Sequence, residues 1–137
     1  MIATLVDSNV LLDVLGRDER WYDWSRAALA ACGDQGPLAI NPVVYGEVSI
    51  RFQTIEALDE ALPSGYFQRL ALPWDAAFLA GKAFLAYRRQ GGPRGSVLPD
   101  FYIGAHAAVS RLPLLTRDTA RYRTYFPTVH LISPAAS

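Results

Sequence analysis

The sequence has little that would attract nucleic acid by charge and little that would suit an oxidising compartment. Its 13 Lys and Arg residues balance 13 Asp and Glu residues, so no overall positive field draws nucleic acid to the chain. A single cysteine, Cys32, excludes a disulfide within the chain, and we expect it to be buried and unreactive. No apolar run approaches the ~20 residues that cross a bilayer, and no basic segment marks a signal peptide. These absences predict a cytoplasmic protein that does not enter a membrane.

Lysine is almost missing as well. Lys82 is the only lysine, so the other cations are all arginines. The guanidinium group of arginine is a planar fork that matches phosphate and carboxylate groups. This composition is compatible with phosphate contact but does not establish it.

Short apolar segments alternate with amphipathic ones along the 137 residues, of which 51% are hydrophobic. The pattern predicts strands at residues 2–6, 38–41, 67–72, 113–116 and 129–132. It predicts helices at residues 8–15, 20–32, 42–52, 54–62, 75–90 and 99–111, and a Gly-rich loop at 91–98. We therefore expect one α/β domain, residues 1–137, with a mainly parallel central sheet of about five strands flanked by helices.

Four acidic residues lie in apolar surroundings. Asp7 ends the first strand, Glu47 interrupts the apolar helix "VVYGEVSI", Asp100 lies in the first turn of an apolar helix, and Asp118 follows the fourth strand. Each has an ordinary explanation, as a helix cap, a favourable charge at a helix N-terminus or the partner of an arginine. A buried carboxylate without a partner is nevertheless costly, so each acid needs a partner or a cation.

Together the four acids predict a cation site. Asp7 and Asp118 follow parallel strands and therefore share one edge of the sheet, and the helix of Asp100 is expected to begin at the same edge. Converging carboxylates repel one another unless a divalent cation neutralises them, and oxygen ligands suit Mg²⁺ or Mn²⁺. Zinc is disfavoured because His106 lies roughly 240° round the helix from Asp100. We expect His106 to be a core or surface residue.

The chain resembles the PIN-domain ribonucleases, and in particular the VapC-type toxins of bacterial toxin–antitoxin pairs. The resemblance follows, in order, "LVDSNVLLDVL", the Glu of "NPVVYGEV", "LPDFYIGAHA" and "PLLTRDTARYRTYFP". The motif "VDSN" alone is weak, whereas the ordered set of acids at these spacings is specific. Residues 54–90 contribute no motif, and Asn41 stands where the family often has a small hydroxyl residue.

The resemblance implies a Mg²⁺- or Mn²⁺-dependent endoribonuclease that acts as the toxin of a type II toxin–antitoxin pair. It implies that Asp7, Glu47, Asp100 and Asp118 are both the catalytic residues and the metal ligands. Ser8, Asn9 and Thr116 match positions that support these acids by hydrogen bonding.

The resemblance also implies three partners, namely RNA, a small cognate antitoxin and a second copy of the chain. Arginines near the last acid and near the Gly-rich loop are the candidates for RNA contact, namely Arg117, Arg121 and Arg94. Trp21, Trp24, Tyr66 and Trp74 are more large aromatics than a small core readily buries, which favours an interface for some of them.

Two other classes of function remain open. A phosphoacceptor signalling module would need paired acids near the first strand and a lysine after a late strand, whereas "LVDSN" has one acid and Lys82 lies within a helix. A catalytically silent PIN-like module that binds RNA or protein is the stronger alternative. The presence of all four acids argues against it.

Overall fold

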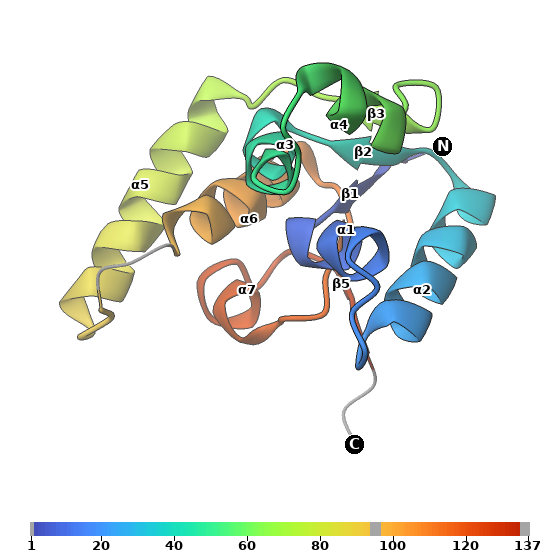
Figure 1. The fold of residues 1–137 in the computed structure, drawn as a ribbon. Helices are drawn as coiled ribbons and strands as arrows, with labels where there is room; N and C mark the ends of the chain where they lie inside the picture. Colours follow the sequence, from blue (N-terminus) through green and yellow to red (C-terminus); the bar gives the residue numbers. More distant parts are fainter. Residues whose placement is uncertain (1, 94–96, 135–137) are drawn as a thin grey trace.

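A five-stranded, fully parallel sheet forms the centre of the protein (Figure 1). The structure is a computed structural model that describes residues 2–93 and 97–134. The strands lie in the order β3-β2-β1-β4-β5. Their bounds are Thr4–Val6 (β1), Leu38–Ile40 (β2), Phe67–Arg69 (β3), Leu114–Leu115 (β4) and Leu131–Ile132 (β5). The prediction of an α/β fold with a mainly parallel sheet of about five strands is confirmed.

Helices connect the strands and flank the sheet, with α5 lying along α6 on one side of Figure 1 and α1 beside α2 on the other. None of the helices in the described part of the chain is long and apolar enough to cross a membrane. Their bounds are Ser8–Leu15 (α1), Tyr22–Gln35 (α2), Pro42–Ser49 (α3), Ile55–Ala61 (α4), Trp74–Arg89 (α5), Leu98–Ser110 (α6) and Ala120–Tyr125 (α7).

The order of the strands creates a switch point between β1 and β4. From β1 the chain moves outward to β2 and then to β3, and it returns through α5 and α6 to place β4 on the other side of β1. In open parallel sheets a crevice opens at such a point, outside the carboxyl ends of the two strands, and ligands bind there. Asp7 follows β1 and Thr116 follows β4, so both lie at this crevice.

The predicted helix boundaries agree well with the structure, and side-chain caps fix two of the helix starts. The side chains of Asn41 and Thr54 accept hydrogen bonds from the third residue after each of them, which fixes the starts of α3 and α4. The strands are shorter than predicted, because only two or three residues of each apolar run pair with a neighbour. The sequence predicted no helix between residues 117 and 128, and α7 corrects this.

Candidate active site

Asp7 lies at the centre of the crevice and is 2% exposed. Its backbone N–H donates to the carbonyl of Leu115, so the pairing of β1 with β4 continues up to this residue and fixes its position. Its carboxylate atom Oδ2 accepts hydrogen bonds from the hydroxyls of Tyr122 at 2.8 Å and Thr116 at 2.9 Å, and from the amide of Asn9 at 3.4 Å. Among the described residues, the other oxygen, Oδ1, has one side-chain contact, with the Ser8 hydroxyl at 3.5 Å, the outer limit of a hydrogen bond.

The alternative reading of Asp7 as a helix cap is wrong. Asp7 does occupy the N-cap position of α1, but its side chain makes no capping hydrogen bond to that helix. Burial raises the pKa of Asp7, the hydrogen bonds from Tyr122 and Thr116 oppose this, and the charge of Asp118 raises the pKa further. The carboxylate is therefore held by specific donors in a place that disfavours its charge.

Ser8 joins the first acid to the second. Its hydroxyl donates to Oε1 of Glu47 at 2.8 Å and lies between this acid and Asp7. Glu47 comes from α3, 39 residues further along the chain, and is partly buried. Burial raises the pKa of Glu47, the hydrogen bond from Ser8 lowers it, and the charge of Asp7 raises it. The two acids therefore lie near each other, on either side of the Ser8 hydroxyl, and the charge of Asp7 acts on Glu47.

Asp100 approaches the same centre from α6. Its Oδ2 forms an ion pair with Nη1 of Arg121 at 2.7 Å. Burial raises the pKa of Asp100 to about 7, the charges of Asp7 and Glu47 raise it as well, and Arg121 opposes them. The charge of Asp7 thus disfavours the ionisation of Glu47, and the charges of Asp7 and Glu47 disfavour that of Asp100.

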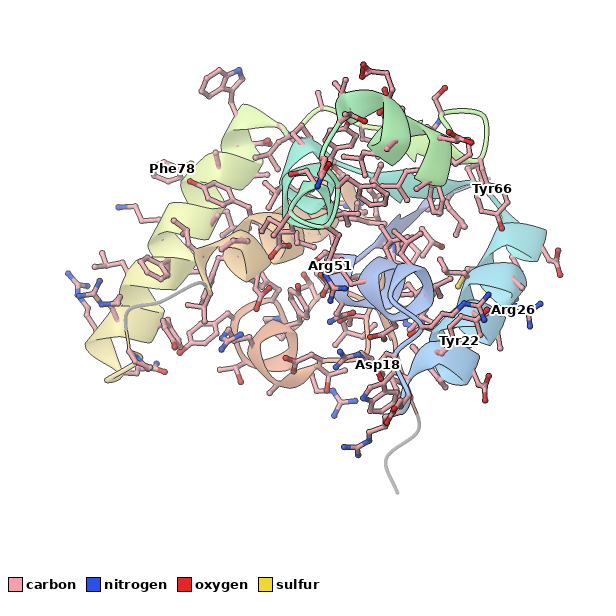
Figure 2. All side chains as sticks on the ribbon, viewed as in Figure 1. Asp18, Tyr22, Arg26, Arg51, Tyr66 and Phe78 are labelled. Atoms are coloured by element: carbon pink, nitrogen blue, oxygen red, sulfur yellow. The ribbon has the colours of Figure 1, made fainter. Side chains whose placement is uncertain are left out.

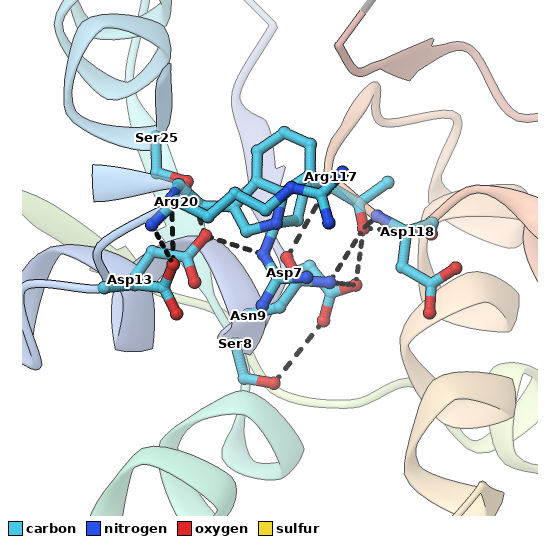
Figure 3. Close-up of polar contacts among 11 residues, drawn as sticks. Asp7, Ser8, Asn9, Asp13, Arg20, Ser25, Arg117 and Asp118 are labelled. Carbon is cyan, nitrogen blue, oxygen red and sulfur yellow. Dashed lines mark hydrogen bonds and ion pairs between the residues drawn. The ribbon is translucent and has the colours of Figure 1, made fainter. Parts of the chain in front are cut away.

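Asp118 lies at the exposed rim of this group. Its backbone N–H donates to Oγ1 of Thr116 at 3.2 Å, and the Thr116 hydroxyl in turn donates to Asp7. Figure 3 shows Asp7 between Ser8, Asn9 and Asp118. The three predicted supporting residues, Ser8, Asn9 and Thr116, are therefore all in hydrogen-bond contact with Asp7.

The side chains are not arranged as a finished metal cage. Within residues 2–93 and 97–134, no group of three His, Cys, Asp or Glu side chains is placed to hold a metal ion. Arg121 instead provides the positive charge nearest to Asp100. The donor set still fits a divalent cation, because it consists of carboxylate oxygens and because the one side-chain contact of Oδ1 of Asp7 in the described part of the chain is long.

The predicted RNA-contacting arginines have different surroundings. Arg117 forms an ion pair with Asp13 at 2.7 Å, and its guanidinium lies 5.4 Å from the ring centre of Trp21. Arg121 is paired with Asp100, and Arg94 lies outside the described residues. Arg117 thus has a structural partner, while contact of these arginines with RNA stays a prediction.

Sequence reasoning missed two residues that shape the site. Tyr122 is 2% exposed, and its hydroxyl donates to Asp7. Burial and then the charges of Asp7 and Asp100 raise the pKa of Tyr122 well above its usual value. Asp13 is 2% exposed, accepts a hydrogen bond from Ser25 at 2.7 Å and pairs with Arg117 (Figure 3). Asp13 interrupts the apolar run of α1 just as Glu47 interrupts that of α3, so the same signal would have found it.

His106 and Cys32 are core residues, as expected. The side-chain amide of Asn41 lies 3.0 Å from Nδ1 of His106. Because the amide oxygen of Asn41 already accepts from Val44, its nitrogen donates and the ring nitrogen accepts. Burial lowers the pKa of His106, which keeps the ring neutral. Burial also raises the pKa of the Cys32 thiol, consistent with an unreactive side chain.

The sequence matches the family model "PIN domain" over residues 4–127. The chain belongs to the PIN-domain family. This match covers every strand of the sheet but β5, and all four acids of the crevice. No curated protein gave a significant match.

Solved structures similar to this PIN domain include several toxin–antitoxin complexes. VapBC2 from Rickettsia felis, bound to a promoter DNA fragment, has a TM-score of 0.74 and 15% identity, covering 98% of this chain and 100% of that one. VapBC-1 from nontypeable Haemophilus influenzae has a TM-score of 0.72 and 17% identity, covering 96% and 98%. A toxin–antitoxin complex from Klebsiella pneumoniae has a TM-score of 0.62 and 26% identity, covering 92% and 94%. The PIN fold therefore extends over nearly the whole chain.

Proposed function

We propose that this PIN-domain protein is a Mg²⁺- or Mn²⁺-dependent endoribonuclease and the toxin of a type II toxin–antitoxin pair. The observation that supports the activity is the approach of Asp7, Glu47 and Asp100 at the switch point of the sheet. The charge of Asp7 raises the pKa of Glu47, and both charges raise the pKa of Asp100. Such a group is unstable without a counter-charge, and perturbed carboxylates in a crevice are typical of catalytic sites. As part of this proposal, the protein acts on RNA in the cytoplasm.

The chemistry follows from the residues. Asp7, Glu47 and Asp100 would hold a divalent cation, with Asp118 completing the site, and the cation would supply Lewis-acid polarisation of a phosphodiester and lower the pKa of a water. Tyr122 and Thr116 hold Oδ2 of Asp7 by hydrogen bonds, and so fix the orientation of this carboxylate. Ser8 orients Glu47. No histidine is needed as a base, and His106 is engaged in the core.

The proposed partners follow from the structural neighbours, whose titles describe VapBC or toxin–antitoxin complexes. We expect a small antitoxin to silence the site by inserting an arginine or lysine among the carboxylates, since a bidentate Arg–carboxylate contact is strong and directional. The pairing of Asp100 with Arg121 at 2.7 Å shows that a guanidinium fits beside these acids.

A homodimer is also part of the proposal. Trp74 is 92% exposed and Phe78 70% exposed, one turn apart on α5, and Figure 2 shows Phe78 pointing away from the body of the protein. Large exposed apolar side chains of this kind are typical of interfaces. Of the other predicted aromatics, Tyr66 is exposed, whereas Trp21 and Trp24 are partly buried against each other. A monomeric mass in light scattering at micromolar concentration would contradict the dimer.

Cleavage of RNA by the purified protein tests the proposed activity. We expect cleavage with Mg²⁺ or Mn²⁺, no cleavage with EDTA, and none by the Asp7→Asn or Asp100→Asn variants. Glu60→Gln is the matched control, because it removes an exposed acid of α4 and should leave cleavage unchanged. Calorimetry should detect Mn²⁺ binding that is weakened in Asp7→Asn.

Two results would overturn the proposal. Absence of both cleavage and metal binding would favour the catalytically silent RNA- or protein-binding module. Cleavage that persists in Asp100→Asn would separate the activity from the carboxylates. In cells, expression of the chain alone should arrest growth, co-expression with its antitoxin should relieve the arrest, and Asp100→Asn should be harmless.

A further inference from the structure

A pocket of about 280 Å³ opens directly beside the carboxylates. Its lining comes from α5, from the turn after β4 and from α7, which meet only in the folded chain. The lining combines two tyrosines, one arginine, one aspartate, one threonine and one alanine. The residues are Tyr87, Asp118, Ala120, Arg121, Thr124 and Tyr125.

The two tyrosine rings that line this pocket pack against the buried ring of Phe101. The rings of Tyr87 and Tyr125 meet edge to face, with centres 5.9 Å apart and planes at 79°. Both rest on Phe101, which is 1% exposed, at centre distances of 5.3 Å and 5.4 Å. Both tyrosines remain partly exposed. The packing on Phe101 fixes both tyrosines, and their partly exposed rings offer aromatic surface to a flat ring in the pocket.

Arg121 connects the pocket to the acids. Its guanidinium carbon lies 5.8 Å from the ring centre of Tyr87, while Nη1 contacts Asp100 at 2.7 Å. Asp118 belongs both to the pocket and to the group of carboxylates. An occupant of the pocket is thus adjacent to whatever binds at the acids.

We propose that this pocket binds one unpaired nucleobase of the RNA, next to the phosphodiester at the carboxylates. This inference rests on the proposed function. Unpaired bases are recognised by stacking on aromatic side chains and on the plane of arginine, and both surfaces are present here. The Thr124 hydroxyl, which donates to the carbonyl of Ala120, can accept a hydrogen bond from the edge of the base. The pocket would make RNA binding depend on the presence of a base at one position.

Binding of short RNAs to cleavage-deficient protein tests the pocket. All chains carry Asp7→Asn, and fluorescence anisotropy with Mg²⁺ present measures their affinity for a labelled single-stranded RNA that the parent protein cleaves. Tyr125→Leu removes the ring, and we expect about tenfold weaker binding, within the range for loss of one stacked base. Tyr125→Phe is the matched control, since it keeps the ring and removes only the hydroxyl that donates to Gln90. It should bind as tightly as the unmodified tyrosine.

A second measurement needs no change in the fold. The same RNA is prepared with a single abasic position, moved one nucleotide at a time. In the protein with Tyr125 intact, one position near the cleavage site should lose about tenfold in affinity. In Tyr125→Leu the same abasic position should cause no further loss, because the contact is already absent. Thermal unfolding of each variant verifies that it is folded.

The outcomes separate this inference from the proposed function. If the chain neither cleaves nor binds RNA, the proposed function fails. If RNA binds but no abasic position weakens it, or if Tyr125→Leu binds as tightly as Tyr125→Phe, the nucleobase pocket is wrong while the nuclease stands. If Tyr125→Leu weakens binding of the antitoxin and leaves RNA binding unchanged, the pocket is a protein contact, and the inference is also overturned.

Discussion

Replacing Asp100 by Asn measures how strongly burial and the neighbouring carboxylates disfavour the charge of Asp100. Folding raises the pKa of Asp100 from 3.8 to about 7, first through burial and then through the charges of Asp7 and Glu47. Between these pH values the folded protein keeps a proton on Asp100 that the unfolded chain has lost. Stability from this group is therefore full below pH 3.8 and is lost as the pH rises through about 7. Asp100→Asn has no ionisable group at this position, so its stability does not fall with pH for this reason.

The pKa change sets the magnitude. One pKa unit corresponds to about 1.36 kcal/mol, so the rise from 3.8 to about 7 corresponds to roughly 4 kcal/mol without solvent screening. The Asp100 side chain is 28% exposed, and water weakens the effect. For metal-free protein at pH 8, we expect Asp100→Asn to raise the free energy of unfolding by roughly 2–4 kcal/mol over the parent. Near pH 4 the two proteins should be about equally stable.

The assay is urea unfolding in EDTA at pH 5, 6.5 and 8, followed by tryptophan fluorescence. If the free energy of unfolding falls with urea concentration at the same slope in variant and parent, the substitution has changed stability alone. Asp59→Asn is a control of opposite sign, because hydrogen bonds from Tyr45 and Arg69 lower the pKa of Asp59. Stability from Asp59 is present above its unfolded pKa and is lost as the pH falls. If Asp100→Asn differs from the parent equally at pH 5 and pH 8, the raised pKa of Asp100 is not the cause of the difference.

Three further predictions concern the stability of variants outside the group formed by Asp7, Glu47, Asp100 and Asp118. Asp13→Asn should lower the free energy of unfolding, measured by urea titration, by about 2 kcal/mol. The variant removes the charge of a carboxylate whose side chain is 3% exposed and which pairs with Arg117. A change within about 0.5 kcal/mol, as for an ordinary surface substitution, would show that the pair adds little. Gly104→Ala should destabilise by about 1–3 kcal/mol, since a methyl group there overlaps the ring of Phe126. Gly46→Ala in α3, where a methyl group meets nothing within 4 Å, should instead stabilise by about 0.5–1 kcal/mol, as thermal unfolding of both variants can verify.

Local sequence signals were sufficient for most of the fold. The apolar run before Asp7 and the cap and proline at Asn41 and Pro42 act within a few residues, so the elements that they define were predicted close to their observed bounds. Helix α7 was missed because six residues give too short a window for a helical period. The short extent of the strands was not predictable either, because pairing depends on the neighbouring strand.

The sequence also determined which acids to expect in the crevice. Asp7, Glu47, Asp100 and Asp118 stand out because each interrupts or ends an apolar segment, and burial of a charge is costly wherever it occurs. Ser8 and Asn9 were expected beside Asp7, and both contact it. The expectation for Ser8 and Asn9 came from the resemblance to the PIN-domain ribonucleases, and the catalytic role of the four acids stays a prediction.

Only the tertiary structure decided how the acids are held and which charges face them. Tyr122 reaches Asp7 across 115 residues of chain, and Arg117 reaches Asp13 across 104, so no local pattern encodes either contact. Arg121, 21 residues from Asp100, becomes its counter-ion because α7 packs against α6. Hydrogen bonds and ion pairs act over about 3 Å, and only the packing of the sheet and helices brings residues so distant in sequence within that range.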